Sequence, residues 1–580
     1  MEMYQHRTVI TDIPFNKNGI ESLKSISRRK PDDFDKWPVV YIIDDGLKKY
    51  AYVGETTNIQ RRMDQHLGNT HRKGLTIAHI IHNHSFNKSV ILDLEAFLIN
   101  YMHADGQFVL QNGNGGQHCH YYYDRDDYKL LFKEIWASLR KKKLVSQDLS
   151  VIENSDLFKY SPFKTLTQDQ YDITEEVLKN LSQDILDGCP SISIINGGAG
   201  TGKSILGVFL VKLLVDSQDD LGWSTEDKDL EDNLSDIAAR LKGNKKLKIA
   251  YVVPMQGFRK TISNVFKSIK GLKSSMVLSP ADVANSKELF DILIVDEAHR
   301  LRRRFGLSSP FDYHAFDKKN KALGCGEEGT ELDWILKKSR HQILFYDSSQ
   351  SIKPADIQPS VFSSIVNKPG THSYQLTSQL RCKGGDDYID YVNGILSCTA
   401  DFRRTIEGYD FRLFEDVQDM FDAIKEKESV HGLCRMIAGY AWDWATKGKR
   451  LEEIKAKGIY DIDIDGYHYV WNTTDKDWIN SENSINEIGC IHTTQGFDLN
   501  YAGIIIGPEF TYDPARNEII VIKELYKDGP GKFKARTGTD LKEYILNIYK
   551  TLLARGILGT YVYACDPCLQ EYLRRFIPVR

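Results

Sequence analysis

The chain has 580 residues, of which 41% are hydrophobic and 27% are charged. This composition excludes a disordered or fibrous chain, and at roughly 100 to 200 residues per domain the length predicts about three to five domains. The formal net charge is only -4, so no global excess of positive charge indicates a nucleic-acid partner. Any such partner must be met by local basic surfaces.

The sequence shows no sign of export or of a membrane anchor. Its nine scattered cysteines fit free thiols in a reducing compartment. The N-terminal segment lacks an apolar core of signal-peptide length, and no run of about 18 apolar residues occurs. We therefore expect a cytoplasmic protein that does not bind a membrane.

The first organised segment begins near residue 38. Two runs of β-branched and aromatic residues, 38–43 and 50–54, flank a polar turn and predict a β-hairpin. The stretch 58–66 then predicts a helix whose N-cap is Thr56, Thr57 or Asn58.

A second helix is expected over roughly 89–103, and the glycine-rich stretch 112–116 predicts a loop. These elements predict a small domain of mixed α and β structure over about 35–120. The polar segment from 121 to 165 predicts a helix followed by a linker, and its basic run 140–143 is more typical of a solvated helix end than of a nucleic-acid patch.

Beyond the linker, short apolar strands alternate with amphipathic helices, which is the sequence form of a parallel α/β sheet. We expect two such units, over 166–370 and 371–580. Nine carboxylates and one lysine between 216 and 236 predict a solvated insertion in the first unit. The predicted strands are 192–196, 249–253, 292–295 and 342–345 in the first unit, and 467–471, 502–506 and 559–563 in the second.

A phosphate-binding loop is the strongest single motif. Residues 197–204 read Gly-Gly-Ala-Gly-Thr-Gly-Lys-Ser between a predicted strand and a predicted helix. In this context the glycines let backbone N–H groups converge on phosphate oxygens at a helix N-terminus. Lys203 is expected to reach the β- and γ-phosphates and Ser204 to supply a Mg²⁺ ligand, and the glycines concerned are Gly197, Gly200 and Gly202.

Two adjacent carboxylates follow the predicted strand 292–295. Because parallel strands end at the same edge of a sheet, we expect Asp296 beside the phosphate loop, where it can hold Mg²⁺. Glu297 is then placed to orient and deprotonate an attacking water. A protein that only binds a nucleotide has no need of that second carboxylate, so ATP hydrolysis is the favoured interpretation.

The stretch Asp296-Glu-Ala-His299, with Leu166-Thr-Gln-Asp-Gln170 upstream, resembles the ATPase core of superfamily 1 helicases, in particular the bacterial relatives of Schlafen-type helicase domains, from about 160 to 575. The resemblance implies two RecA-like parallel α/β motor domains that use ATP and Mg²⁺. It also implies that Gln170 reads the adenine edge and that Gln350 senses the γ-phosphate.

In the second unit the resemblance covers three further motifs, at 376–381, 491–498 and 549–555, and implies two arginine fingers, Arg381 and Arg555. The family's Thr-Arg pair is Ala554-Arg555 here. The run 300–304 carries four arginines, and it predicts either contacts with strand phosphates or a solvated helix face. The residues expected to contact strand and ribose are Gln495, Gly496 and Asp498.

The N-terminal domain resembles the GIY-YIG endonuclease family over residues 35 to about 120, with Val39 and Val40 in place of the first glycine and isoleucine. The resemblance implies that Glu95 binds a divalent metal (Mg²⁺ or Mn²⁺) and that Tyr41 or Tyr52 activates water. Arg62 is then expected to stabilise the phosphate, with assistance from His66 and Asn112.

This set is chemically self-consistent. Phosphodiester hydrolysis requires a hard cation, a base for water and a cation facing the developing charge, and Glu95, the tyrosines and Arg62 supply one of each. The alternative is that the tyrosines are half-buried strand residues, that Glu95 is a paired core carboxylate and that His66 is a surface residue.

The sequence therefore predicts an ATP-dependent nucleic-acid translocase or helicase with its own metal-dependent endonuclease that cleaves DNA. Such fusions suggest bacterial anti-phage defence or, second, DNA repair, by analogy of architecture only. The alternatives are a nucleotide-switched clamp or regulator whose N-terminal domain does not cleave, and an RNA-directed motor. Homo-oligomers and a partner protein of a defence system are also compatible with the sequence.

Overall fold

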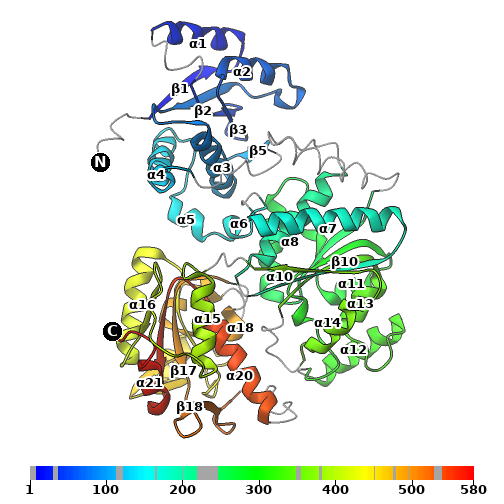
Figure 1. Ribbon diagram of the computed structural model, residues 1–580, viewed down its shortest axis with the longest axis vertical. Helices are drawn as coiled ribbons and strands as arrows, with labels where there is room; N and C mark the ends of the chain where they lie inside the picture. Colours follow the sequence, from blue (N-terminus) through cyan, green and yellow to red (C-terminus); the bar gives the residue numbers. More distant parts are fainter. Residues whose placement is uncertain are drawn as a thin grey trace. The chain divides into compact units, whose positions relative to one another are not determined.

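The computed structural model describes residues 8–29, 37–112, 122–162, 166–198, 200–218, 246–307, 309–347, 355–377, 382–449, 451–474, 478–494, 497–527 and 538–580. The chain forms two compact units (Figure 1). The first is made mainly of the chain up to Thr167, with further segments between residues 208 and 272, and the second contains the remainder.

The first unit is built on a five-stranded sheet in the order β1-β4-β2-β3-β5. β2 and β3 pair antiparallel, with Tyr41 opposite Gly54, which confirms the predicted hairpin. β1 pairs with β4 at the sheet edge, so the sheet begins well before residue 35. The strands are β1 (Val9–Pro14), β2 (Val39–Asp44), β3 (Tyr50–Thr56), β4 (Ile77–His82) and β5 (Val109–Leu110).

Helices cover both faces of this sheet. On one face, α1 (Lys17–Arg29) and α2 (Ile59–Gly68) pack on the side chains of Tyr41 and Tyr52, and on the other α3 (Lys88–Asp105) packs on Val40 and Ile42. Asn58 is the N-cap of α2, and its side chain accepts a hydrogen bond from the backbone of Arg61 at 3.0 Å. The sheet therefore presents two tyrosines to the helix that carries the predicted arginine and histidine.

The segment predicted to be a linker contributes to the core of this unit. It contains α4 (Arg125–Lys141), α5 (Leu149–Asn154) and α6 (Asp156–Lys159). Phe132 and Trp136 of α4 are buried in the same apolar cluster as the inner face of α3. The apolar face of α4 packs in the core of the domain. Its basic end, at 140–143, is exposed, as the sequence predicted.

The first α/β lobe has a six-stranded sheet in the order β11-β6-β10-β9-β7-β8, and all its strands are parallel. It contains all four strands predicted for this unit. The strands are β6 (Ser191–Gly197), β7 (Ile249–Val252), β8 (Val277–Leu278), β9 (Phe290–Val295), β10 (Ser339–Tyr346) and β11 (Thr371–Leu376).

Helices follow these strands in the alternation that the sequence predicted, and α11, α13 and α14 bury apolar side chains against one face of the sheet. Of the acidic segment 216–236, only the first three residues lie within the described part of the chain. The helices are α7 (Gln168–Leu186), α8 (Lys203–Asp216), α10 (Gln256–Ser268), α11 (Pro280–Asn285), α12 (Pro310–Leu323), α13 (Glu331–Lys338) and α14 (Pro359–Val366).

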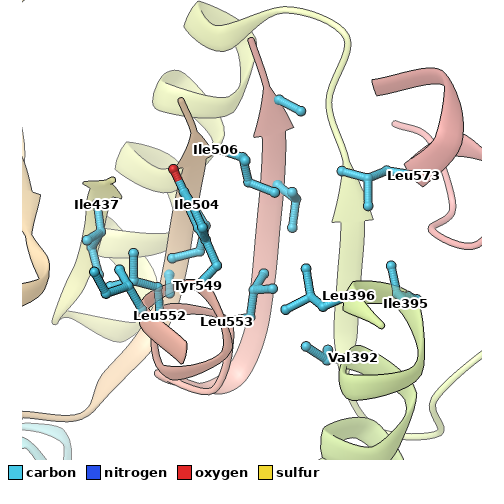
Figure 2. Close-up of a cluster of buried hydrophobic side chains, with 14 of the residues drawn as sticks. Val392, Ile395, Leu396, Ile437, Ile504, Ile506, Tyr549, Leu552, Leu553 and Leu573 are labelled. Atoms are coloured by element: carbon cyan, nitrogen blue, oxygen red, sulfur yellow. The ribbon is translucent and has the colours of Figure 1, made fainter. Parts of the chain in front are cut away.

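The second lobe has a five-stranded parallel sheet in the order β12-β20-β17-β13-β16. Its helices cover both faces, with α16 on one and α15 and α20 on the other (Figure 1). Figure 2 shows the apolar core on the face covered by α15 and α20, where Leu552 and Leu553 of α20 lie near Ile504 of β17. The helices are α15 (Gly385–Leu396), α16 (Val417–His431), α17 (Leu451–Lys457), α18 (Ile491–Thr494), α20 (Gly538–Leu553) and α21 (Pro567–Arg574).

One strand prediction for this lobe is wrong for most of its length, since only Trp471 makes a parallel bridge to Ile488 of the sheet. The segment 467–471 was expected in the parallel sheet, but β15 (Tyr467–Tyr469) pairs antiparallel with β14 (Ile462–Ile464) in a separate two-stranded sheet. A tight turn at Asp465 and Gly466, both with positive φ, makes this local pairing possible. The remaining strands are β12 (Asp410–Leu413), β13 (Cys434–Ala438), β16 (Ile488–Cys490), β17 (Leu499–Ile506), β18 (Phe510–Asp513), β19 (Glu518–Val521) and β20 (Gly556–Ala564).

Among the helices that the structure describes, none is long and apolar enough to cross a bilayer.

Candidate active sites

The first candidate site forms where β2 and β3 face α2. The ring of Tyr41 lies directly over Gly54, and a Cβ at Gly54 would come within 2.3 Å of the Tyr41 hydroxyl. Only glycine therefore leaves room for this tyrosine. The two predicted motif segments, on β2 and β3, thus pack directly against each other. Tyr41 is fully buried in the process.

The Tyr41 hydroxyl also lies 2.8 Å from Nε2 of His66 on α2, and it accepts a hydrogen bond from Nε of Arg62 at 3.3 Å. Arg62 and His66 are four residues apart, so they stand on the same face of α2. Burial, with the positive charges of Arg62 and Arg72, lowers the pKa of His66 to about 3. His66 is therefore neutral at physiological pH and can accept the phenolic proton.

The two tyrosines differ in their surroundings. Burial and the neighbouring Tyr52 raise the pKa of Tyr41 well above its ordinary value, against an opposing effect of Arg62. Burial and the charge of Glu95 raise the pKa of Tyr52, while Arg72 and Arg62 oppose the rise. Glu95 of α3 thus acts electrostatically on both phenols, which places the predicted metal ligand close to the tyrosines.

Asn112 follows β5 at the end of the described segment 37–112, and its side chain is hydrogen-bonded to β3. Its Oδ1 accepts from the backbone N–H of Val53 at 3.1 Å, and its Nδ2 donates to the Val53 carbonyl at 2.8 Å. Both ends of the amide are therefore engaged with β3, between Tyr52 and Gly54. This geometry favours a role in positioning the strand over direct contact with substrate.

Sequence reasoning missed one cation of this cluster. The guanidinium of Arg72 stacks on the ring of Tyr52, with Cζ 3.6 Å from the ring centroid. Its Nη1 donates to Oε1 of Gln111 at 3.0 Å. Arg72 follows α2 in a basic turn with no motif spacing, so only the fold brings it to the site.

The second candidate site is the phosphate loop of the first α/β lobe. The loop joins the end of β6 to the start of α8, as predicted, and both Gly200 and Gly202 have positive φ. Lys203 is buried, and its Nζ donates to the carbonyls of Gly197 at 2.6 Å and Gly198 at 2.7 Å. The lysine is thus held inside the loop, at the position expected for phosphate.

The two predicted carboxylates follow β9 at the same edge of the sheet. Asp296 is fully buried; its Oδ2 accepts from the Tyr251 hydroxyl at 2.7 Å, and it is hydrogen-bonded to Ser204. Burial and the adjacent Glu297 raise the pKa of Asp296 above its ordinary value.

Glu297 has a φ of 49°, a left-handed conformation that a glutamate seldom adopts. Burial alone would raise its pKa, but the charges of His299, Lys203 and Arg300 outweigh that effect and hold the pKa below the ordinary value. Nε2 of His299 lies 2.8 Å from a Glu297 carboxylate oxygen. An ionised carboxylate kept in a strained backbone conformation is typical of a functional site.

Two further residues complete this site without a sequence signal. Asp347, directly after β10, lies 3.4 Å from Nζ of Lys203. Tyr251 of β7 reaches Asp296 because Gly207 of α8 leaves space for its ring, and a Cβ there would come within 2.7 Å of the Tyr251 hydroxyl. The predicted Gln170 is buried and donates to the carbonyl of Thr201, so it lies against the phosphate loop.

In the second lobe, Arg555 is buried after α20, and its Nη1 donates to the carbonyl of Phe497 at 3.2 Å. Asp498 follows Phe497 in the chain and directly precedes β17, so two predicted site residues of this lobe lie near each other. The other candidates, Gln350, Arg381, Gln495 and Gly496, lie outside the described residues.

The arginine run 300–304 does not form the solvated helix face that was one of its two interpretations. Arg300 ends a short 3₁₀ turn and pairs with Asp356 at 2.9 Å, and Arg302 pairs with Glu331 at 2.7 Å. Both arginines line a pocket together with the segment 254–259. Arg300 is 5% exposed, and its Nε and Nη2 have no hydrogen-bond partner among the described residues.

The residues expected to hold metal fit a hard divalent cation. Ser204 and Asp296 bring a hydroxyl and a carboxylate oxygen together, which are ligands that Mg²⁺ accepts. No group of three or more His, Cys, Asp or Glu side chains suited to a metal occurs in the described part of the chain. Sites with one or two protein ligands, as at Ser204 with Asp296 and at Glu95, are the kind in which Mg²⁺ keeps several waters.

Comparisons with known proteins match both parts of the chain. Residues 190–566 match the family model described as Schlafen group 3, DNA/RNA helicase domain, and residues 38–104 match the GIY-YIG catalytic domain. An uncharacterized protein of Saccharomyces cerevisiae is 29% identical over 450 residues, covering 71% of this chain and 91% of the relative.

Among solved structures, a DEAD box protein from the hyperthermophile Methanococcus jannaschii is 13% identical, covers 71% of this chain and 94% of its own, and has a TM-score of 0.24. A Pif1 helicase from Bacteroides in complex with ADP-AlF3 and ssDNA is 12% identical, with coverages of 72% and 95% and a TM-score of 0.26. A Pif1 helicase from Candida albicans is 12% identical, with coverages of 71% and 99% and a TM-score of 0.27.

A helicase domain hydrolyses ATP and a GIY-YIG catalytic domain cleaves phosphodiester bonds, so the chain is an enzyme of both kinds. The fold is the α/β multidomain arrangement that the sequence predicted, with a small α+β nuclease domain before two parallel, RecA-like lobes. The chain belongs to the family described as Schlafen group 3, DNA/RNA helicase domain, and carries a GIY-YIG catalytic domain ahead of it.

Proposed function

We propose that the protein is an ATP-driven motor that moves along nucleic acid and that its N-terminal domain is a metal-dependent endonuclease that cuts DNA. The observation that carries this proposal is the presence of two separate reactive constellations in one chain. One is the Tyr41, His66 and Arg62 cluster beside Glu95, and the other is Lys203 with Asp296 and Glu297.

In the nuclease domain, Tyr41 is the group placed to receive the proton of the attacking water. As its oxygen accepts that proton, its own proton passes to Nε2 of His66 along the 2.8 Å contact. Burial and, to a smaller extent, two arginine charges lower the pKa of His66, and a bound phosphodiester, with its negative charge, offsets the effect of the arginines and makes His66 a better base. The base is thereby strengthened when substrate is present.

Arg62 donates to Tyr41 and carries its charge beside the reacting phosphate, where charge builds during cleavage. Glu95 would hold a divalent cation, which would supply polarisation of the phosphate. Asn112 keeps β3, and with it Tyr52, in register with the site. Each predicted residue of the cluster thus has a distinct task.

In the motor, Lys203 exchanges its loop carbonyl contacts for the β- and γ-phosphates of ATP, and Gln170 lies against the same loop to read the adenine. Glu297, kept ionised by neighbouring positive charges, orients and deprotonates the water that attacks the γ-phosphate. Ser204 and Asp296 hold Mg²⁺, and Gln350, Arg381 and Arg555 respond to the γ-phosphate.

The nucleic-acid strand is proposed to contact the pocket lined by Arg300 and Arg259. The unpartnered Nε and Nη2 of the buried Arg300 are two donors suited to a phosphate oxygen. Gln495, Gly496 and Asp498 would contact strand and ribose from the second lobe. DNA is favoured as the substrate, RNA is the second choice, and defence against foreign DNA is favoured over repair.

The decisive experiment incubates the full chain with plasmid and end-labelled DNA, with and without ATP and with Mg²⁺ or Mn²⁺. Lys203→Ala is expected to abolish ATP turnover, and Glu95→Ala to abolish cutting while turnover is retained. Lys260→Ala and Glu134→Ala, both exposed, are matched controls that should change neither activity. Cutting that survives Glu95→Ala would refute the nuclease, and turnover that ignores every nucleic acid would refute the motor.

The second candidate function is a nucleotide-switched clamp that does not cut. The left-handed, ionised Glu297 argues against it, because a switch needs no water-activating carboxylate. The same assay distinguishes the two functions, since a clamp would bind DNA in an ATP-dependent manner and leave every strand intact.

A further inference from the structure

The nuclease cluster contains a second arginine that has no counterpart in the predicted set. We propose that Arg72 is a positioning residue of this site, which holds the ring of Tyr52 and supplies positive charge to the reacting groups through it. The inference rests on the proposed nuclease function and adds a residue to it.

Arg72 stacks on Tyr52 and is hydrogen-bonded to Gln111. The Arg72 guanidinium lies 3.6 Å from the centroid of the Tyr52 ring, so the two planar groups are in van der Waals contact. Its Nη1 donates both to Oε1 of Gln111 at 3.0 Å and to the Gln111 carbonyl at 3.4 Å. Gln111 precedes Asn112, which itself is bonded to Val53 of β3, so one short segment fixes the strand and the arginine together.

Arg72 has no acidic partner among the described residues. Within this part of the chain, the polar contacts of Arg72 go to Gln111 and to the side chain of Tyr52, and none goes to a carboxylate. A half-buried cation without an acidic partner is costly to keep, and burial accordingly lowers the pKa of Arg72. A phosphodiester is the anion that would offset this cost during the reaction.

Arg72 also changes the net charge of the cluster. With His66 neutral, the formal charges of Arg62, Arg72 and Glu95 sum to one positive charge, whereas without Arg72 the cluster would be neutral. A nuclease site must attract a phosphate that carries one negative charge. Arg72 adds one positive charge to this attraction, beside the charge that a divalent cation at Glu95 would supply. Arg72 also opposes the rise in the pKa of Tyr52 and lowers the pKa of His66.

The test is a double-mutant cycle on the full chain, followed as single-turnover cutting of end-labelled DNA with enzyme in excess. Arg72→Met is expected to lower the cutting rate about tenfold or more while KM changes less than about threefold. In a Tyr52→Phe background the same change should cost less than about twofold, because the variant lacks the hydroxyl to which Arg72 is hydrogen-bonded and through which its charge acts. A merely structural arginine would lower the rate equally in both backgrounds.

Arg72→Lys keeps the charge without the planar stack, so its rate should fall between those of the wild type and Arg72→Met. Lys73→Met, at the adjacent exposed lysine, is the control for loss of one positive charge and should cut normally. ATP turnover and the unfolding temperature report folding. If Arg72→Met cuts as fast as the wild type, acts on KM alone, or is additive with Tyr52→Phe, the inference is wrong.

Failure of this inference can be distinguished from failure of the proposed nuclease. Glu95→Ala is assayed in parallel, and if its cutting persists the nuclease itself is wrongly assigned. If Glu95→Ala is inactive and Arg72→Met is normal, the nuclease stands and only the role of Arg72 is refuted.

Discussion

The hydroxyl of Tyr41 lies 2.8 Å from Nε2 of His66, and the imidazole is neutral because burial and two arginines lower its pKa to about 3. The pair joins a strand to a helix and connects the phenol to a proton acceptor. It is the relationship on which the proposed cleavage chemistry depends.

Removing the Tyr41 hydroxyl should abolish most cleavage. Tyr41→Phe keeps the buried ring and loses only the oxygen, so we expect a loss of about 100-fold or more in cutting, as for a general base, with ATP turnover unchanged. Tyr123→Phe, at an exposed tyrosine, is the control. A Tyr41→Phe variant that cuts at the wild-type rate would exclude Tyr41 as the base.

The same histidine predicts how stability depends on pH. In the unfolded chain His66 takes up a proton near pH 6.5, but in the folded domain it does so only near pH 3. The unfolded state therefore binds more protons between these values, and the stabilising contribution of neutral His66 is lost as pH falls through that window. Urea unfolding of this domain at pH 7.5 and 5 should show the loss, and His66→Gln should lessen it.

Gly54→Ala should damage the nuclease domain specifically. The new Cβ would lie 2.3 Å from the hydroxyl of the fully buried Tyr41, so ring or strand must shift at a cost of about 1–3 kcal/mol. Cutting should fall with ATP turnover intact, and the thermal unfolding of the domain should shift downward. Gly68→Ala, with no atom within 4 Å of its Cβ position, is the control and should be neutral.

A second histidine predicts the opposite pH dependence. His79 lies between Asp12 and Asp44, each 2.8 Å from a ring nitrogen, and Asp12 also pairs with Lys142. Burial lowers the pKa of His79, but the two carboxylates outweigh burial and raise it overall. The contribution of charged His79 is thus complete below about pH 6.5 and is lost as pH rises through the higher, folded pKa.

Because Asp12 belongs to β1, this loss should loosen the edge strand. Hydrogen exchange of residues 9–14, compared with His79→Gln at each pH, should show protection at pH 6 that the variant lacks, and the two proteins should converge at pH 9. Exchange that is identical in both proteins at pH 6 would contradict the prediction.

Tyr251→Phe should impair ATP hydrolysis. The change removes the 2.7 Å hydrogen bond to Asp296 and leaves a buried carboxylate oxygen unsatisfied, which costs about 1–3 kcal/mol. We expect the turnover rate to fall about tenfold, with DNA cutting in the absence of ATP unchanged. Tyr313→Phe on α12 is the matched control, and equal turnover in the two variants would contradict a role for Tyr251.

Local patterns in the sequence were enough to predict several elements of the fold and of the sites. The hairpin of β2 and β3, the Asn58 cap of α2 and the strand, loop and helix around Lys203 were all predictable, because alternation, capping and glycine spacing act between residues close in the chain. The segment 467–471 failed because its apolar alternation suits a hairpin as well as a parallel strand.

Long-range pairing could not be predicted in this way. β1 joins the sheet by pairing Val9 with His82, and α4 contributes Trp136 to a core formed mainly by α3. Neither contact leaves a periodic signal in the sequence, because each depends on where a distant surface lies. For the same reason the sequence predicted a helix and a linker over 121–165 and did not predict that α4 packs in the core.

The sequence by itself determined the two chemistries, since the motifs around Lys203, Glu297 and Tyr41 require particular residue types at particular spacings. Only the tertiary structure decided which groups act together. Tyr251 reaches Asp296, and Arg72 stacks on Tyr52, because sheet register and close helix packing bring distant residues to within about 4 Å of each other. Short-range contacts of this kind set pKa values and orientation, and one-dimensional spacing does not contain them.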